Sequence, residues 1–201
     1  FPLENVRKGI FDMAEKLYGV TFSELPDAPK YNPEVKVYDV KDAKTGEHIA
    51  VFMTDYFPRA SKRQGAWMSE FQGAFTDPDG SSQRPIVYNV GNFTKPTGDT
   101  PSLLTLDEVE TMFHEFGHGL HGMLTKVKLR SQAGTNVDRD FVELPSQIHE
   151  HWAMEPEMLK SYARHYKTGE AIPDSLITKL IDASTHNQGF ITTELVGAAL
   201  L

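Results

Sequence analysis

Apolar residues near the amino terminus recur with the spacing of an α-helix. They fall on one helical face: Val6, Ile10, Met13 and Leu17. Gly19 follows at a position where helices commonly end, so the pattern predicts an amphipathic helix over residues 3–18. Three prolines interrupt the segment 20–34, which we interpret as a loop.

Alternating apolar and polar residues come next and are typical of β-strands. Strand patterns occupy three ranges: 35–40, 48–56 and 85–93. The first two are joined by the turn sequence Lys44-Thr45-Gly46 and predict a β-hairpin. The third begins with Pro85, which fits an edge strand or the start of a strand. The range 64–75 fits a strand or a loop equally well.

The periodicity becomes helical from Thr105 onward. Thr105 and Glu108 have the spacing of a capping box, which predicts a helix from there to about Met123. A polar loop is expected over 124–139. Four further helices are predicted at 141–153, 156–167, 173–185 and from 188 to the end. Strands therefore precede most helices, which predicts an α+β fold with a small antiparallel or mixed sheet and a mainly helical second part.

The 201 residues suit one domain. We expect a β-containing part over about 35–93 and a helical part over about 105–201. The final residues, Gly197 to Leu201, are apolar and carry no helix-stop signal. We therefore expect a partial domain that is truncated at its carboxyl end.

Composition narrows the classes of protein that fit. Apolar residues make up 39% and charged residues 24%, and no segment has the length and hydrophobicity of a membrane span. The net charge of −8 argues against a nucleic-acid partner. There is no cysteine, which excludes disulfides and thiolate metal sites. Phe1-Pro2-Leu3-Glu4 lacks the features of a signal peptide, so we expect a cytoplasmic protein.

A histidine-glutamate motif lies inside the helix predicted from Thr105. The sequence His114-Glu115-Phe116-Gly117-His118 has the form H-E-x-x-H. Residues i and i+4 of a helix lie on one face about one turn apart, so both imidazoles can converge on one ion. The motif therefore predicts a zinc site that holds one Zn²⁺ per chain.

Glu115 is offset from the two histidines and can reach the open side of the ion. Zinc lowers the pKa of a coordinated water to about 7 and polarises a peptide carbonyl. Glu115 would act there as general base and return the proton to the leaving amine. An accidental motif on a solvated helix is disfavoured, because Met112, Phe113 and Leu120 predict a buried helix.

A zinc site of this type needs a third protein ligand. His121 is seven residues from His114, about 10.5 Å along the helix, so one ion cannot bind both. We interpret His121 as a packed histidine. The helix predicted from 141 offers other candidates: Glu143, Glu150 and His151. Glu143 has an alternative role as the capping-box partner of Asp140, and spacing alone leaves the choice open.

The residues around the motif are distinctive over six stretches: Asn92–Pro96, Pro101–Leu104, Asp107–Thr111, Phe113–His118, Gly134–Val137 and Arg139–Gln147. Together they resemble the thimet oligopeptidase family of zinc peptidases. Gly65–Met68 and Glu150–Ala153 look most like the bacterial peptidyl-dipeptidase branch of that family. The resemblance covers essentially the whole chain.

The resemblance implies a ligand set and an activity. The family's third zinc ligand is the glutamate of an F-V-E-x-P-S-Q motif, which maps onto Glu143. The implied activity is hydrolysis of short unstructured peptides, with release of carboxyl-terminal dipeptides. The family's catalytic domain continues into a loop with histidine and tyrosine residues, and nothing after Thr193 matches it. We therefore expect this chain to bind zinc and to hydrolyse peptides weakly.

The strand that precedes the zinc helix is the expected substrate site. Zinc peptidases commonly bind substrate as an added β-strand. We predict that seven residues form the edge that receives it: Ile86, Val87, Tyr88, Asn89, Val90, Gly91 and Asn92. A purely structural strand is the alternative. Trp67 and Phe93 are candidates for lining substrate pockets, although aromatic residues are more often part of the core.

Glu150 lies seven residues after Glu143, on the same predicted helix face. We expect it to contact His114 or His118 and to orient the imidazole. Three alternative functions stay open: an endo-acting oligopeptidase of the same family, a non-catalytic module with a closed zinc site, and a protein-interaction domain. Cobalt or manganese could replace zinc in vitro. The oligomeric state does not follow from the sequence.

Overall fold

Helix α1 (Leu3–Tyr18) has the predicted bounds. The structure, a computed structural model, describes residues 1–201. Val6, Ile10 and Met13 are buried on one face of the helix, as the periodicity predicts, whereas Leu17, the fourth residue of the predicted face, is exposed. Gly19 ends the helix with φ of 65°, a left-handed conformation that glycine adopts without steric cost.

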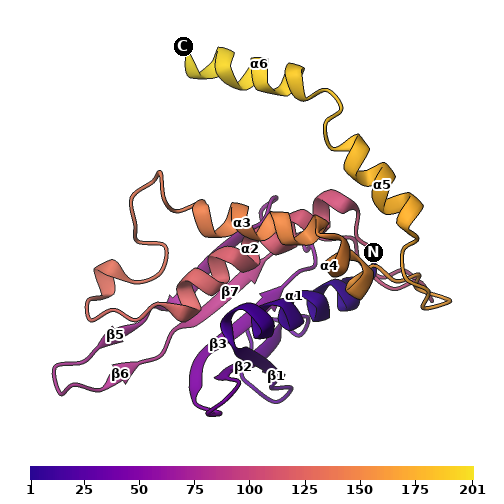
Figure 1. Ribbon diagram of the computed structural model, residues 1–201. Coiled ribbons are helices and arrows are strands. Elements are labelled where there is room, and N and C mark those ends of the chain that lie inside the picture. Colours follow the sequence, from indigo (N-terminus) through magenta and orange to yellow (C-terminus); the bar gives the residue numbers. More distant parts are fainter.

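A mixed five-stranded sheet forms the base of the molecule (Figure 1). Its strands are β1 (Val20–Glu24), β2 (Lys36–Asp42), β3 (His48–Asp55), β4 (Trp67–Gln72) and β7 (Ile86–Val90), in the spatial order β1-β2-β3-β7-β4. The pair β3–β7 is parallel, and the other neighbours are antiparallel. A second hairpin, β5 (Phe75–Thr76) with β6 (Ser82–Gln83), projects from one end. The predicted β2–β3 hairpin and the α+β class are confirmed.

One strand differs from the sequence-based expectation, and another lies in a range that the sequence left open. Strand β1 lies in the range that was predicted to be a loop. It ends before the first proline, and Val20 and Phe22 alternate toward α1 and the core. Strand β4 occupies the range 64–75 that fitted either structure, and it forms one edge of the sheet.

A network of ion pairs holds the loop that leads into β4. Asp55, at the end of β3, is only 1% exposed and bonds the guanidinium of Arg59 at 2.8 Å and Nζ of Lys62 at 2.9 Å. Lys62 also donates to the main-chain oxygens of Asp55, Phe57 and Gly91. These bonds tie the loop before β4 to the ends of β3 and β7.

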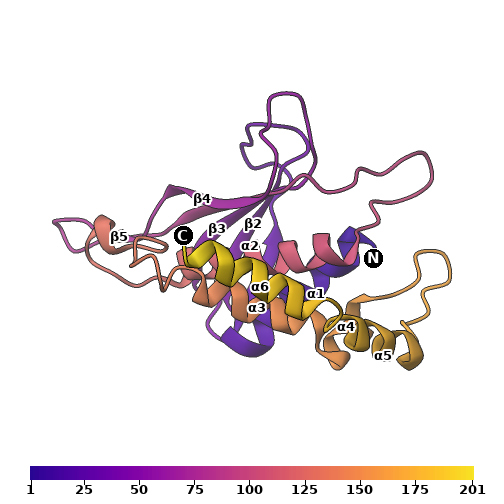
Figure 2. The same cartoon turned by 90° about the horizontal axis from the view of Figure 1, so that it is seen from above.

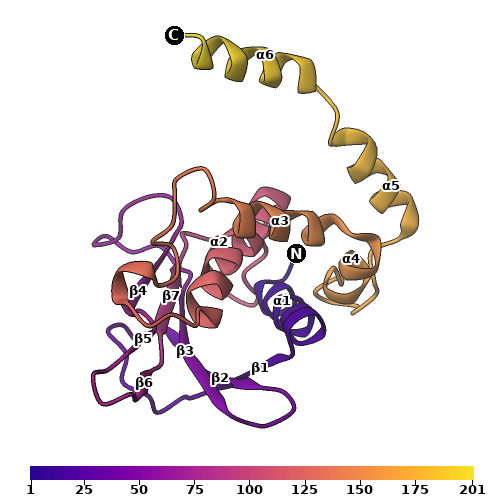
Figure 3. The ribbon, with the colours of Figure 1, turned by 60° about the vertical axis from the view of Figure 1, so that its left-hand side comes forward.

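Helices form two layers above the sheet. Helix α2 (Leu106–Leu124) contacts β3, β4 and β7, and α3 (Leu144–Met154) lies against α2 (Figures 1 and 3). The predicted capping box of Thr105 and Glu108 starts α2. Between sheet and helices, Phe52 and Phe116 pack edge to face with ring centroids 5.6 Å apart. Helix α4 (Pro156–Tyr162) packs on α1.

The last two helices extend away from this body. Helix α5 (Asp174–Ala183) buries only Ile177, and α6 (Gln188–Ala199) buries no residue. Although α6 overlaps α3 in the view from above (Figure 2), Figure 1 shows it well clear of that helix. None of the helices combines the length and the apolar character that crossing a bilayer requires.

Candidate metal centre

Three side chains converge at the contact between α2 and α3. His114 and His118 are one turn apart on α2, with ring centroids 4.9 Å apart. Oε2 of Glu143 lies 3.3 Å from Nε2 of His114 and 3.1 Å from Nε2 of His118. The structure therefore brings together the three residues that the motif and the resemblance named as ligands.

The donor atoms of this cluster fit a divalent metal ion. One atom from each residue lies within 4.8 Å of the others. Ligand atoms around a tetrahedral zinc with bonds of about 2.1 Å lie about 3.4 Å apart, close to the two distances from the Glu143 oxygen. Two imidazoles and one carboxylate are a donor set that suits zinc. These residues could therefore hold such an ion without a large rearrangement.

The position of Glu143 follows from where α3 begins. The helix was predicted to start at 141 with Asp140 as a cap, but it starts at Leu144. Glu143 is the residue before the helix, and its side chain makes no cap hydrogen bond. The capping-box alternative is therefore wrong, because Glu143 precedes the first turn. Its carboxylate is free to face the histidines.

Ser146 holds the Glu143 carboxylate, a contact that was not predicted from the sequence. Its Oγ donates to Oε2 of Glu143 at 2.8 Å, and the Ser146 side chain is fully buried. This hydrogen bond, together with the nearby histidines, keeps the pKa of Glu143 below its usual value. The spacing of three residues in Glu143-Leu144-Pro145-Ser146 is the signal that could have revealed it.

Glu150 contacts His114 on the side of the ring away from Glu143. Its Oε1 lies 2.5 Å from Nδ1 of His114. The contact is the one expected from the position of Glu150 on the α3 face. A bond at Nδ1 leaves Nε2 of the same ring directed at Glu143.

Glu115 lies in a buried position beside the two histidines. It is 8% exposed, and its Oε2 has no hydrogen-bond partner. Burial raises the pKa of Glu115 to about 7, although the charge of His114 and a hydrogen bond from the Met68 main chain act in the opposite direction. Leaving a buried carboxylate oxygen without a hydrogen-bond partner costs free energy, so such an atom calls for an explanation. Because Oε2 has no partner, it is available to accept a proton.

The predicted substrate edge is wrong. Strand β7 is an interior strand, because residues Ile86 to Val90 pair with β3 on one side and with β4 on the other. The remaining predicted residues are also engaged: the main chain of Gly91 bonds Asp55 and Lys62, and the Asn92 side chain donates to Arg63 and Gly65. No edge is available there for another strand. The misplacement affects all seven residues: Ile86, Val87, Tyr88, Asn89, Val90, Gly91 and Asn92.

Strand β4, and not β7, forms the edge of the sheet beside the candidate metal centre. It is the last strand of the sheet and pairs only with β7. Its first two residues line a cavity of about 410 Å³ that also contains the candidate metal centre; the lining residues are Ala66, Trp67, Met68, His114, Glu115, His118, Thr135, Val142 and Glu143. Trp67 therefore lines this cavity as expected, whereas Phe93 is buried against Tyr56 and belongs to the core.

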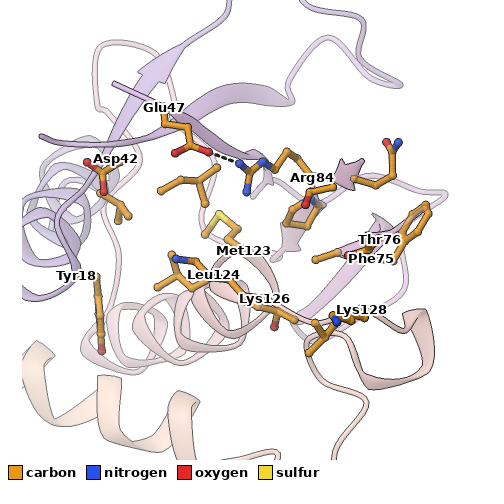
Figure 4. Close-up of a pocket in the computed structure, with 18 residues that line it drawn as sticks. Tyr18, Asp42, Glu47, Phe75, Thr76, Arg84, Met123, Leu124, Lys126 and Lys128 are labelled. Atoms are coloured by element: carbon orange, nitrogen blue, oxygen red, sulfur yellow. Dashed lines mark hydrogen bonds and ion pairs between the residues drawn. The ribbon is translucent and has the colours of Figure 1, made fainter. Parts of the chain in front are cut away.

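Other cavities lie outside this centre. One of about 630 Å³ lies beyond the end of α2, between the β5–β6 hairpin and the turn after β2 (Figure 4). It contains Lys126 and Lys128 and an ion pair between Arg84 and Glu47, but none of the predicted site residues. His121 is also outside the cluster and packs against Phe141, with ring centroids 6.2 Å apart.

Comparison with known proteins identifies the family to which the chain belongs. The chain is 45% identical to a dipeptidyl carboxypeptidase of Escherichia coli and 46% identical to that of Salmonella typhimurium, in both cases over the whole chain and 29% of the relative. It is 40% identical to oligopeptidase A of Escherichia coli over 97% of the chain and 29% of that protein. The chain thus spans less than a third of the length of these relatives. The model of Peptidase family M3 matches residues 1–201, and the protein therefore belongs to peptidase family M3.

Proposed function

We propose that this chain carries the zinc centre of a metallopeptidase that hydrolyses short peptides. The observation that carries the proposal is the convergence of the Glu143 carboxylate with Nε2 of His114 and His118, at 3.3 and 3.1 Å. Membership of peptidase family M3 supports peptide hydrolysis. A zinc ion held by these residues would supply Lewis-acid chemistry, polarising a peptide carbonyl and acidifying a water molecule.

Each nearby residue of the chain has a role in this proposal. Glu115 accepts a proton through its unpartnered Oε2 and delivers it to the leaving amine. In the metal-free protein burial raises the pKa of Glu115 to about 7, a range that suits a group that must both take and give a proton near neutral pH. Glu150 orients the His114 ring through Nδ1, and Ser146 holds the Glu143 carboxylate.

The substrate in this proposal binds along β4. A free strand edge offers main-chain hydrogen bonds to any extended peptide, whatever its sequence. The Met68 main chain approaches Glu115, so a peptide on this edge would lie beside the proposed base. Trp67 would contact a substrate side chain, since it lines the same cavity.

Release of carboxyl-terminal dipeptides is the activity that we infer for the complete protein. The similarity to two bacterial dipeptidyl carboxypeptidases supports it. The similarity to oligopeptidase A favours endopeptidase activity as a second candidate. Peptides with a free or an amidated carboxyl terminus distinguish the two, because a strict peptidyl-dipeptidase rejects the amidated form.

The first test concerns the metal. After metal-replete purification, elemental analysis should find one zinc per wild-type chain and almost none in Glu143→Ala. Absence of zinc from the wild type would overturn the proposal. Four protein ligands around the ion would favour a structural site, because catalytic sites keep an open position.

A further inference from the structure

Helix α2 has a glycine between its two histidines, and the first turn of α3 lies directly against it. A Cβ atom at Gly117 would lie 2.7 Å from the main-chain oxygen of Pro145 and 2.7 Å from Cα of Ser146. Carbon atoms that touch normally stay about 3.5–4.0 Å apart. Even an alanine side chain therefore does not fit, and the atoms that would have to move belong to the backbone of α3. The backbone of Gly117 is not in the left-handed region, so the requirement for glycine is one of space.

The turn that meets Gly117 is held from several sides. His149 is 3% exposed, and its Nδ1 donates to the Pro145 carbonyl at 2.5 Å. The hydroxyl of Tyr18, at the end of α1, lies 3.0 Å from Nε2 of the His149 ring. A proline in the first turn of α3 further limits its backbone. Displacing the turn would therefore disturb bonds to another helix as well.

Glu143 depends on the same turn. Ser146, whose main chain would collide with a Cβ at position 117, also donates through Oγ to Oε2 of Glu143. That oxygen is the one that faces both histidines. A shift of the turn away from α2 would therefore carry the carboxylate away from the two imidazoles.

We propose that Gly117 is a positioning residue for Glu143: the missing side chain sets the distance between α2 and α3 at which the third ligand reaches the metal. The inference rests on the proposed zinc centre. It goes beyond the ligand set because Gly117 itself touches neither metal nor substrate. It acts through the turn that contains Pro145 and Ser146.

Gly119 on the same helix provides a matched control. A Cβ there would meet Oδ1 of Asn89 at 3.2 Å and a ring carbon of Phe52 at 3.4 Å, both in side chains on the sheet side of α2. Gly117→Ala and Gly119→Ala thus make the same change to the helix backbone. Only the first change presses on the turn before Glu143.

The test measures the dissociation constant for zinc by competition with a chromophoric chelator. Gly117→Ala should raise it about 10–100-fold, the usual cost of losing an outer partner of a metal ligand. Gly119→Ala should stay within about twofold of the wild type. In a Glu143→Ala background, Gly117→Ala should change the constant by no more than about twofold, because the group that it positions is absent.

Three outcomes would overturn the inference. The first is a zinc affinity of Gly117→Ala equal to that of the wild type, and the second is weakening by Gly119→Ala as large as that by Gly117→Ala. The third is equal weakening by Gly117→Ala in both backgrounds, which would mean that the substitution acts on the fold and not through Glu143. Circular dichroism and thermal unfolding of the metal-free variants establish whether each protein is folded.

A second variant covers the case in which Gly117→Ala does not fold. Ser146→Ala keeps the main chain of the turn packed against Gly117 and removes only the Oγ that holds Glu143. It should weaken zinc binding in the wild-type background and have no further effect in Glu143→Ala. Wild-type affinity in Ser146→Ala would then overturn the role of the turn. A wild-type chain that binds no zinc would instead overturn the proposed function itself, so the two failures are distinct.

Discussion

Oε1 of Glu150 lies 2.5 Å from Nδ1 of His114, while Nε2 of the same ring faces Glu143. The carboxylate accepts a hydrogen bond from Nδ1–H, so this tautomer of His114 directs the lone pair of Nε2 toward the candidate metal position. Glu143 lies just before α3 and Glu150 lies within it, so one segment of the chain places a carboxylate on each side of the ring.

Glu150→Ala should therefore weaken zinc binding by about 10–100-fold, because the imidazole loses its orienting partner. The chelator competition assay measures this change. Glu157→Ala is a suitable control, since Glu157 is an exposed glutamate on the neighbouring helix α4. Equal zinc affinity in Glu150→Ala and Glu157→Ala would contradict the orienting role.

Glu115→Gln should separate metal binding from chemistry. The amide keeps the shape of the side chain but cannot accept a proton, and Glu115 is not part of the three-residue cluster. We expect one zinc per chain and a fall in peptide hydrolysis of about 10²–10⁴-fold. Elemental analysis and cleavage of a quenched fluorescent peptide measure the two properties. Loss of zinc from the variant would show that Glu115 contributes to binding.

Peptide binding should protect β4 and not β7 from hydrogen exchange. The edge of β4 is free to pair with a peptide, whereas β7 is paired on both sides. A short peptide hydroxamate, which binds zinc, is the probe for the zinc-loaded protein. Slower exchange at Trp67–Gln72, with no change at Ile86–Val90, is the expected result. Protection confined to other segments would rule out substrate binding along β4.

Acid should destabilise the protein in part through Asp55. Burial alone would raise the pKa of this carboxyl, but hydrogen bonds from Arg59, Lys62 and Tyr31 outweigh it, and the pKa lies below the ordinary value of 3.8. The stabilising contribution is thus fully present above pH 3.8 and is lost as the pH falls through the lower pKa of the folded state.

The measurement compares chemical unfolding of the wild type and of Asp55→Asn at several pH values. The variant should be less stable at neutral pH, because the side chain of Lys62 is only 2% exposed and would lose its charged partner. The difference in free energy should shrink as the pH falls below 3.8. A difference that stays constant over that range would mean that the charge of Asp55 does not stabilise the fold.

Local patterns predicted the bounds of α1 and of α2, the helix that carries both histidines. The two helices have strong periodicity together with Gly19 and the Thr105–Glu108 box, and both were placed to within one residue. These bounds depend on residues that are close in the chain, which is why a single sequence contains them. The contact of Glu150 with His114 joins two helices, and it could be expected only because Glu150 shares a helix face with Glu143, which the resemblance had named as a ligand.

The predictions that failed concern features that depend on contacts between distant segments. The strand predicted at Ile86–Val90 is present, but its sequence does not indicate that β4 pairs with it on the side opposite β3. The order of strands in a sheet depends on contacts between distant segments. The start of α3 was misplaced because Asp140 is a good cap residue by type, whereas the position of the first turn is set by its packing on Gly117.

The strand order β3-β7-β4 has a consequence for how the site forms. Strand β4 is synthesised before β7, yet β7 is its only neighbour in the sheet. Strand β4, the proposed substrate-binding strand, therefore has no partner until Ile86–Val90 pairs with β3. Helix α2 follows β7 in the chain after a loop of 15 residues. Pairing of distant segments is slow compared with helix formation. Strand β4 should thus become ordered only after β7 has paired with β3, so the cavity that contains His114 and His118 should gain its β4 side in a late step of folding.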